Sequence, residues 1–267
     1  MDGKALFLWD GKTSRSIYQH KSHIGELDWS ADGRLAFTEF YTFVYSTDQP
    51  PQDPPEIQIW DGTTVDSLSQ NSTGEDRRPT WSTDGKLAFL SERDGAYDIF
   101  IWDGRSTVDG FADGHTFTNV APDLTSYFSS PVWTDSGTLS FVGYGPGDQH
   151  AQIYEWDGQK AVNISQNAGL HNGGQSWRGD GTWAFVTYFS PEQLLYVRDS
   201  NNQTVLTTAG EYPPAWSENG RLMFCVPDSA GRWGLAIWDG SAVVEIANDY
   251  EIEAFWSNGA GVLCSSG

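Results

Sequence analysis

The sequence predicts an all-β chain, a six-bladed β-propeller built from four-stranded antiparallel blades. Two tryptophan anchors alternate along the chain without a gap, and no window shows the 3.6-residue apolar period of a helix. The first anchor, a Trp before a Gly-containing turn, starts at Trp29, Trp81, Trp133, Trp177, Trp216 and Trp256. The second anchor, Trp-Asp-Gly after an alternating strand, starts at Trp9, Trp60, Trp102, Trp156 and Trp238, with Arg198-Asp199-Ser200 filling one place.

The plainest repeat covers residues 79–104. Residues 79–82 and 86–91 are predicted as two strands joined by Asp84-Gly85, which supplies the positive φ angles of a tight hairpin turn. Residues 98–102, Asp-Ile-Phe-Ile-Trp, are predicted as a third strand, and another Asp-Gly pair ends it. One such sheet cannot bury both of its faces, so the repeat needs copies of itself on either side.

The chain begins and ends in the middle of a repeat. Residues 5–9 and 14–18 have the pattern of a third and a fourth strand, whereas residues 252–256 and 261–265 have the pattern of a first and a second. We therefore expect the two ends to form one blade, which would close a ring. The expected single domain, residues 1–267, has blades at about 24–69, 78–121, 129–166, 174–207, 212–247, and 252–267 together with 1–19.

Composition limits the partners of this chain. Its 36 acidic and 15 basic residues give a formal net charge of −21, which would repel nucleic acid and anionic membrane surfaces. Many Asp residues precede Gly in turns, where Asp suits the backbone geometry, so part of the charge follows from turn chemistry. Cation binding, binding of a basic peptide and a salty habitat stay open as reasons for the rest.

Cysteines and targeting signals give limited information about the compartment. Cys225 and Cys264 occupy similar places in the second strands of consecutive repeats, and we expect two buried free thiols rather than a disulfide. Residues 1–10 carry too short an apolar run for a signal peptide, and no run reaches the length of a transmembrane segment. We expect no membrane insertion, and the compartment stays open.

The repeat resembles that of TolB-type propellers, which also occurs in the propeller domains of prolyl-oligopeptidase-like enzymes. The motif is Pro-x-Trp-Ser-x-Asp-Gly-x-Leu-Ala-Phe, an Asp-Gly turn, and then Asp-Ile-x-Ile-Trp-Asp-Gly, and the resemblance covers the whole chain. It implies a binding funnel on the face where consecutive blades are linked. The additional N-terminal domain of TolB is absent from this sequence, and no Gly-x-Ser-x-Gly nucleophile motif of a hydrolase domain occurs. Because such propellers serve many roles, the resemblance does not choose a function.

Two insertions interrupt the regular spacing of the anchors. In the first repeat the extra residues fall between the second and third strands, where residues 40–45 run into the proline-rich residues 49–55. The second insertion lies at residues 105–115, between the third and fourth strands of the next repeat. Because alternate connections of a four-stranded meander leave at opposite ends, we expect the two loops on opposite faces.

The blade-linking face holds the candidate binding residues. Three residues before each first-anchor Trp stand Glu26, Arg78, Ser130, Gly174, Pro213 and Glu253, and eleven residues after it stand Phe40, Glu92, Tyr144, Tyr188 and Pro227. These positions vary in chemistry while the anchors do not, which a surface freed from the repeat would show; ordinary solvent exposure predicts the same variation. The predicted binding residues are Glu26, Phe40, Arg78, Glu92, Tyr144, Tyr188 and Glu253.

Other chemistries fit the sequence less well. The Trp anchors could stack on sugars, but their regular place before turns favours packing between blades. Asp109, Asp113 and His115 lack the ligand count and spacing of a known calcium loop. Nothing in the spacing of His20, His23, His150 and His171 shows that they converge on a zinc ion, and a carboxylate pair such as Glu26 and Glu253 is common in so acidic a chain.

We therefore expect a non-catalytic binding module for a protein or peptide, with no catalytic residue, no metal site and no cofactor. The alternative is a calcium-supported enzyme or lectin that acts on a sugar or lactone in the central funnel. The chain is expected to be a monomer or a domain of a larger protein.

Overall fold

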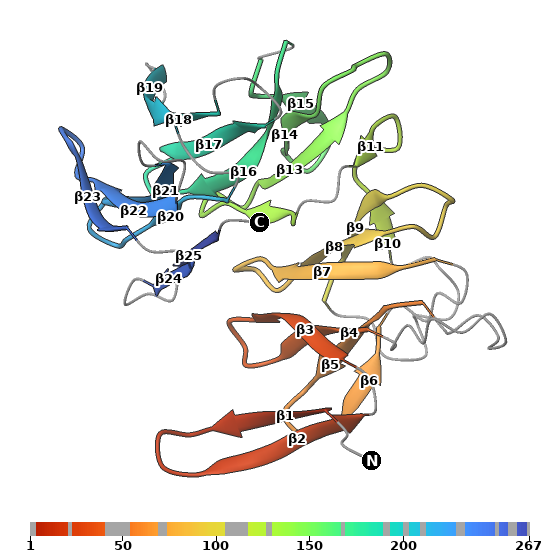
Figure 1. Ribbon diagram of the computed structural model, residues 1–267. Helices are drawn as coiled ribbons and strands as arrows, with labels where there is room; N and C mark the ends of the chain where they lie inside the picture. The colour runs from red at the N-terminus through yellow and green to blue at the C-terminus, as the bar shows by residue number, and fades with distance from the viewer. Residues whose placement is uncertain are drawn as a thin grey trace, which may run out of the picture. The chain divides into compact units, whose positions relative to one another are not determined.

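The computed structural model describes residues 4–20, 23–40, 54–68, 74–104, 117–126, 130–166, 169–188, 193–199, 203–208, 212–227, 233–248, 251–255 and 261–265. These residues form antiparallel strands and turns, which confirms the predicted all-β fold (Figure 1). Within these ranges no helix has the length and apolar character that a membrane crossing needs. The chain divides into two compact units, Met1–Trp133 and Thr134–Gly267.

The first unit contains two four-stranded sheets and a hairpin. Its strands are β1 (Lys4–Trp9), β2 (Ser14–His20), β3 (His23–Trp29), β4 (Leu35–Phe40), β5 (Glu56–Trp60), β6 (Val65–Ser67), β7 (Asp76–Trp81), β8 (Leu87–Ser91), β9 (Asp98–Trp102), β10 (Phe117–Asn119), β11 (Thr125–Ser126) and β12 (Val132–Trp133). The strands β3 to β6 and β7 to β10 pair in chain order as two meanders, and β1 pairs with β2. These are the first and second predicted blades and the N-terminal half of the sixth.

The second unit contains the remaining strands. They are β13 (Leu139–Tyr144), β14 (Gln152–Trp156), β15 (Ala161–Asn163), β16 (His171–Trp177), β17 (Trp183–Tyr188), β18 (Leu194–Arg198), β19 (Gln203–Thr208), β20 (Ala215–Trp216), β21 (Leu222–Pro227), β22 (Trp233–Trp238), β23 (Val243–Asn248), β24 (Glu251–Phe255) and β25 (Gly261–Ser265). The strands β16 to β19 and β20 to β23 form two meanders, and β24 pairs with β25. Joining of the two terminal hairpins into one closing blade stays a prediction.

The two predicted insertions fall between the strands that the spacing indicated. Residues 41–55 separate β4 from β5, and residues 103–116 separate β9 from β10. Residues 41–53 and 105–116 themselves lie outside the described part of the chain, so the faces that the loops occupy stay a prediction.

The turns after four of the first anchors repeat one hydrogen-bond pattern. The Ser82 hydroxyl accepts a 2.8 Å hydrogen bond from the Lys86 backbone N–H and donates one of 2.6 Å to Asp84. Gly85 has a φ of 85°, which favours glycine. The same backbone hydrogen bond to a side-chain hydroxyl recurs at Ser30, Thr134 and Ser217, so contacts between residues two and four apart fix these four hairpins locally.

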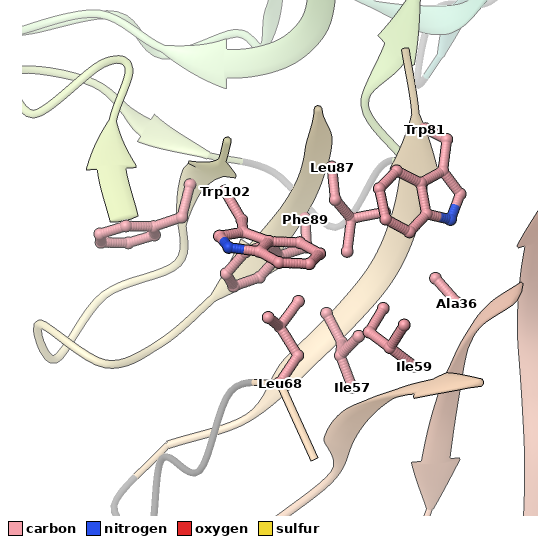
Figure 2. Packing of buried hydrophobic residues seen from close by; sticks show 9 residues of the cluster. Ala36, Ile57, Ile59, Leu68, Trp81, Leu87, Phe89 and Trp102 are labelled. Carbon is pink, nitrogen blue, oxygen red and sulfur yellow. The ribbon is translucent and has the colours of Figure 1, made fainter. Parts of the chain in front are cut away.

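The core of the first unit joins its two sheets through tryptophans. Ile57 and Ile59 of β5 pack beside Trp81 of β7 and Trp102 of β9, and all four side chains are buried (Figure 2). The rings of Trp81 and Trp102 lie 5.9 Å apart. Packing of the anchors between neighbouring sheets is what the sequence predicts for them, since aromatic side chains bury the largest apolar area.

The second unit corrects the expected state of the cysteines. Cys225 of β21 is buried and disulfide-bonded, so the prediction of a free thiol at this position is wrong. The chain has one other cysteine, Cys264, which lies in β25, and β21 packs beside β25. Similar places in consecutive repeats are therefore near enough for a cross-link, which the sequence argument had set aside in favour of two free thiols.

Candidate functional site

The blade-linking face is the end of each blade where the first strand begins and the second strand ends. In the first strands of three blades a β-bulge breaks the register at the same repeat position: between Gly25 and Asp28, between Arg77 and Thr80, and between Gly173 and Ser176. One residue at each bulge is left-handed, with φ of 51° at Glu26, 57° at Arg78 and 58° at Gly174. Only glycine adopts this conformation without strain, so the backbone at Glu26 and Arg78 is strained.

Three of the residues that stand three positions before a first-anchor Trp contact one another in the first unit. Glu26 Oε2 accepts hydrogen bonds from the Arg78 backbone N–H at 2.9 Å and from the Thr38 hydroxyl at 2.8 Å. Arg78 Nη1 in turn donates to Ser130 Oγ at 3.2 Å. The Glu26 and Arg78 side chains remain 26% and 29% exposed. An acid, a base and a hydroxyl from successive repeats thus form one fixed polar row that solvent can reach.

Phe40 belongs to a second group on the same face. The Arg77 guanidinium lies 5.0 Å from the centre of the Phe40 ring, and His23 lies 5.8 Å from it on the other strand of the pair. Arg77 Nε is 2.8 Å from Glu75 Oε2, which also accepts a 2.6 Å hydrogen bond from the Tyr97 hydroxyl. This group presents an aromatic ring beside paired charges, an arrangement common at protein interfaces.

Glu92 lies next to this second group. Burial raises the pKa of Tyr97 well above its ordinary value, and the hydrogen bond to Glu75 and the charges of Glu75 and Glu92 raise it further. The Glu92 backbone N–H donates to the Glu75 carbonyl oxygen at 2.9 Å. Tyr97 therefore remains a protonated hydrogen-bond donor between two carboxylates at neutral pH.

The second unit places Tyr144 beside two histidines. The Tyr144 and His171 rings lie 6.1 Å apart, and the His150 and His171 rings lie 4.7 Å apart, both edge to face. His171 Nδ1 accepts a 3.1 Å hydrogen bond from the Ala151 backbone N–H. Burial, together with the neighbouring His150, lowers the pKa of His171 below its ordinary value. His171 is therefore neutral at pH 7.

Tyr188 lies against backbone that carries no side chain. A Cβ atom added at Gly173 would approach Tyr188 Cε2 to 2.8 Å, and one added at Gly174 would approach the Tyr188 hydroxyl to 2.6 Å. The two glycines are therefore required for the ring to lie where it does. Next to them, Gln175 is 5% exposed, and neither polar atom of its side chain has a hydrogen-bond partner among the described residues. A buried amide of this kind calls for a bound group or an ordered water.

The remaining candidates are not brought together in the described residues. His20 pairs with the buried Glu39, and no group of three or more His, Cys, Asp or Glu there is placed to hold a metal ion. Asp109, Asp113 and His115, the calcium candidates, lie outside the described residues. Glu253 lies in β24, but its side chain is also outside them, so its pairing with Glu26 stays a prediction.

Several residues on this face were missed by the sequence argument. Arg77 lies against Phe40, Glu75 pairs with Arg77, and Tyr97 donates to Glu75, although none of these three residues stands at the two repeat positions that were used. The bulge at Arg78 changes the alternation of the strand and so the placing of Arg77. Gln175 had a usable signal, because the same repeat position holds proline at Pro79, Pro131 and Pro214.

Comparison with protein-family models and with curated proteins finds no match in sequence. Solved structures do match the fold. TolB from Acinetobacter baumannii is 17% identical with a TM-score of 0.57, over 96% of this chain and 58% of that one. The β-propeller domain of the Trilobed protease from Pyrococcus furiosus, which has an open velcro topology, is 17% identical with a TM-score of 0.59, over 92% of this chain and 75% of that one.

A gluconolactonase from Xanthomonas campestris also matches, at 13% identity and a TM-score of 0.50, over 91% of this chain and 86% of that one. At these identities the likeness shows the fold alone, and the chain spans little more than half of the Acinetobacter TolB. The fold is a TolB-like propeller of the kind also found in peptidases, as the repeat motif predicted. Neighbours with different activities share it, so the function has to be argued from the face itself.

Proposed function

We propose that this chain is a non-catalytic binding module that takes a protein or peptide segment at the blade-linking face. The observation that carries the proposal is the fixed row from Glu26 through Arg78 to Ser130, held on strained backbone at two non-glycine positions. Strain of this kind persists where a side chain has to be held in one place, and it is concentrated at binding and catalytic sites. The row uses residues from three repeats, so it belongs to the face and not to one blade.

The side chains of this face suit a peptide. Arg and Tyr are enriched among the residues that dominate protein interfaces, because each combines a large contact surface with hydrogen-bonding groups. Arg77 and Arg78 can donate to peptide carbonyl oxygens, and Tyr144 and Tyr188 offer aromatic surface in the second unit. The net charge of −21 favours a partner segment rich in Lys and Arg, since charge complementarity speeds encounter and fixes register.

The alternative is a calcium-supported enzyme or lectin acting on a sugar or lactone in the funnel. The likeness to a gluconolactonase supports it at the level of the fold. Its metal ligands would have to come from side chains outside the described residues, in part or in whole, because those within them offer no cluster of three. Added calcium should then raise the unfolding temperature markedly, and a chelator should lower it.

The proposal is tested by selecting binders from a random dodecapeptide display library and measuring their affinity by calorimetry. We expect selected peptides enriched in Lys and Arg. Arg78→Gly should weaken their binding at least about tenfold, or about 1.4 kcal/mol. The matched control is Lys86→Ala, which removes one positive charge from the opposite end of the same blade and should leave binding unchanged.

Glycine is chosen at Arg78 because Gly174 holds the same conformation in the fourth blade, so the variant should fold. Undiminished binding by Arg78→Gly would show that the site is elsewhere. Failure to select any peptide, together with a calcium-dependent rise in unfolding temperature or turnover of gluconolactone, would replace the proposal with the alternative.

A further inference from the structure

The fourth blade departs from the repeat at its second anchor. In the first, second and fifth blades the two anchor tryptophans pack edge to face or tilted, with ring centres 5.9 Å apart for Trp29 and Trp60 and 6.2 Å apart for Trp216 and Trp238. In the fourth blade the second anchor is Arg198. Trp177 instead stacks on Trp183 at 5.2 Å with the rings 13° from parallel.

The anchor tryptophan of the fourth blade also lacks the arginine that covers two of its equivalents, Trp81 and Trp216. Arg34, five residues after Trp29, lies 4.4 Å over the Trp81 ring of the next blade. Arg178, one residue after Trp177, lies 4.9 Å over Trp216 of the next blade. The residues at the same two offsets in the third blade are Thr134 and Thr138, which hydrogen-bond to each other at 2.7 Å and are too short to cover Trp177.

These two departures leave a cavity of about 360 Å³ between the third and fourth blades, within the second unit. Its lining consists of Glu155, Ile164, Gln166, Trp177, Asp180, Gly181, Trp183, Arg198 and Asp199. The volume lies within the range of small-molecule sites. The cavity is at the end of the blade where β16 ends and β17 begins, which is opposite to the blade-linking face.

The lining combines an aromatic platform with hydrogen-bonding groups of both kinds. Trp177 is the half-buried outer end of a stack that continues through Trp183, Phe185 and Tyr196, with ring centres 5.2, 4.7 and 4.9 Å apart. The Trp177 indole N–H is buried and has no acceptor among the described residues. Glu155, Asp180 and Asp199 also line the cavity; Glu155 Oε1 already accepts a 2.5 Å hydrogen bond from the Thr138 hydroxyl, and Asp180 is paired with Arg178.

The unmet indole donor is a feature of this position. At the same anchor, the Trp133 indole N–H donates to the Thr80 carbonyl oxygen at 3.0 Å, and the Trp216 indole N–H donates to the Ser176 carbonyl oxygen at 3.1 Å. Trp81 also lacks an acceptor among the described residues, but Arg34 covers its ring. At Trp177 the unmet donor lies in the lining of a cavity.

We propose that this cavity binds a neutral saccharide ring. The C–H face of a pyranose packs on an indole, a ring or hydroxyl oxygen can accept the Trp177 N–H, and hydroxyl groups can donate to the carboxylates. A cationic ligand fits less well. The Arg198 guanidinium lines the cavity, Asp180 is already paired with Arg178 at 2.5 Å, and a buried N–H donor repels a cation. The site is separate from the proposed peptide face and does not depend on it.

The test measures binding of methyl glucoside, methyl galactoside, methyl mannoside and N-acetylglucosamine to the full chain by saturation-transfer NMR and calorimetry. We expect at least one to bind. Thr138 stands at the repeat position of Arg34, which covers Trp81 of the next blade, so Thr138→Arg should cover Trp177 and abolish the binding. Lys86→Arg, at the same repeat position one blade earlier, should not change it. Trp177→Phe keeps an aromatic ring and removes the N–H, so it should weaken binding several-fold.

Thermal unfolding of each variant shows whether it folds, and Trp177→Phe carries the test if Thr138→Arg does not. No binding by any of the four sugars would overturn the proposal. So would sugar binding that both variants leave unchanged, and so would binding of butylammonium, the cationic probe, in place of the sugars.

Discussion

Glu26 and Arg78 hold the backbone conformation that Gly174 holds in the fourth blade. Each left-handed residue other than glycine costs about 1–2 kcal/mol, so two residues on one face carry a cost that their side-chain contacts offset. Glu26 offsets it by accepting from the Arg78 N–H and the Thr38 hydroxyl. The Arg78 side chain makes a 3.2 Å hydrogen bond to Ser130 and a partly exposed ion pair with Glu26, in which Nε and Oε1 are 3.7 Å apart. The two residues should therefore respond differently to the same substitution.

Glycine at each position separates strain from contacts. Arg78→Gly relieves the left-handed strain and loses a partly exposed hydrogen bond, so the free energy of unfolding should stay within about 1 kcal/mol of the parent. Glu26→Gly leaves the Arg78 N–H and the Thr38 hydroxyl without their acceptor, so it should lower the free energy of unfolding by about 2 kcal/mol. Urea unfolding measures both. Equal losses in the two variants would mean that the conformation at Arg78 carries no relievable strain.

For single residues, the sequence predicts which positions lie on the blade-linking face better than it predicts which residues contact them. The repeat register identified Glu26, Arg78 and Ser130 as neighbours, and the structure brings them into contact. The register could not identify Arg77, because a β-bulge changes the alternation of the strand at this point. Among these bulges, only Gly174 in the fourth blade has a residue type that indicates the left-handed conformation in the sequence. Likewise, Gln175 can be recognised from the sequence only by comparison with the prolines that hold the same position in three other repeats.

Within the strands, short-range patterns predicted most of what the structure shows. Strands β9 and β25 have the predicted bounds, and β1 and β24 differ from them by one residue at an end. The reason is local, since Asp-Gly and Ser-x-Asp turns fix each hairpin by contacts within five residues. The disulfide at Cys225 was missed because it depends on how two strands pack, which no local pattern encodes.

The disulfide should contribute much of the stability of β21. A cross-link between the two cysteines of the chain would close a loop of about 40 residues, for which a loss of about 4 kcal/mol on removal is expected. Cys225→Ser should therefore lower the unfolding temperature strongly, and dithiothreitol should lower that of the parent but not that of the variant. Val226→Ala, in the same strand, is the control: it keeps both cysteines, so reductant should lower its unfolding temperature as it lowers that of the parent. A parent that is insensitive to reductant would contradict the cross-link.

Across the whole molecule, the number of repeats and their order follow from the sequence, whereas closure of the ring does not follow from any single strand. Large apolar side chains are exposed on β1, in the predicted closing blade, and on β23, in the fifth blade. Phe7 and Trp9 of β1 are 65% and 69% exposed, and Val244 and Ile246 of β23 are 55% and 51% exposed. Exposed apolar surface of this kind marks a place where another element is expected to pack. The predicted closing blade is such an element.

Closure is the central claim, because the blade-linking face is a funnel only if the blades form a ring. In an antiparallel pair each strand directs alternate N–H groups to its one neighbour, and β25 is paired with β24 along one edge. If β1 pairs with the other edge of β25, the remaining N–H groups are bonded as well. Amide hydrogen exchange resolved by residue in NMR measures this directly. A closed ring predicts slow exchange at every one of residues 262–264, and fast exchange at alternate residues would contradict it.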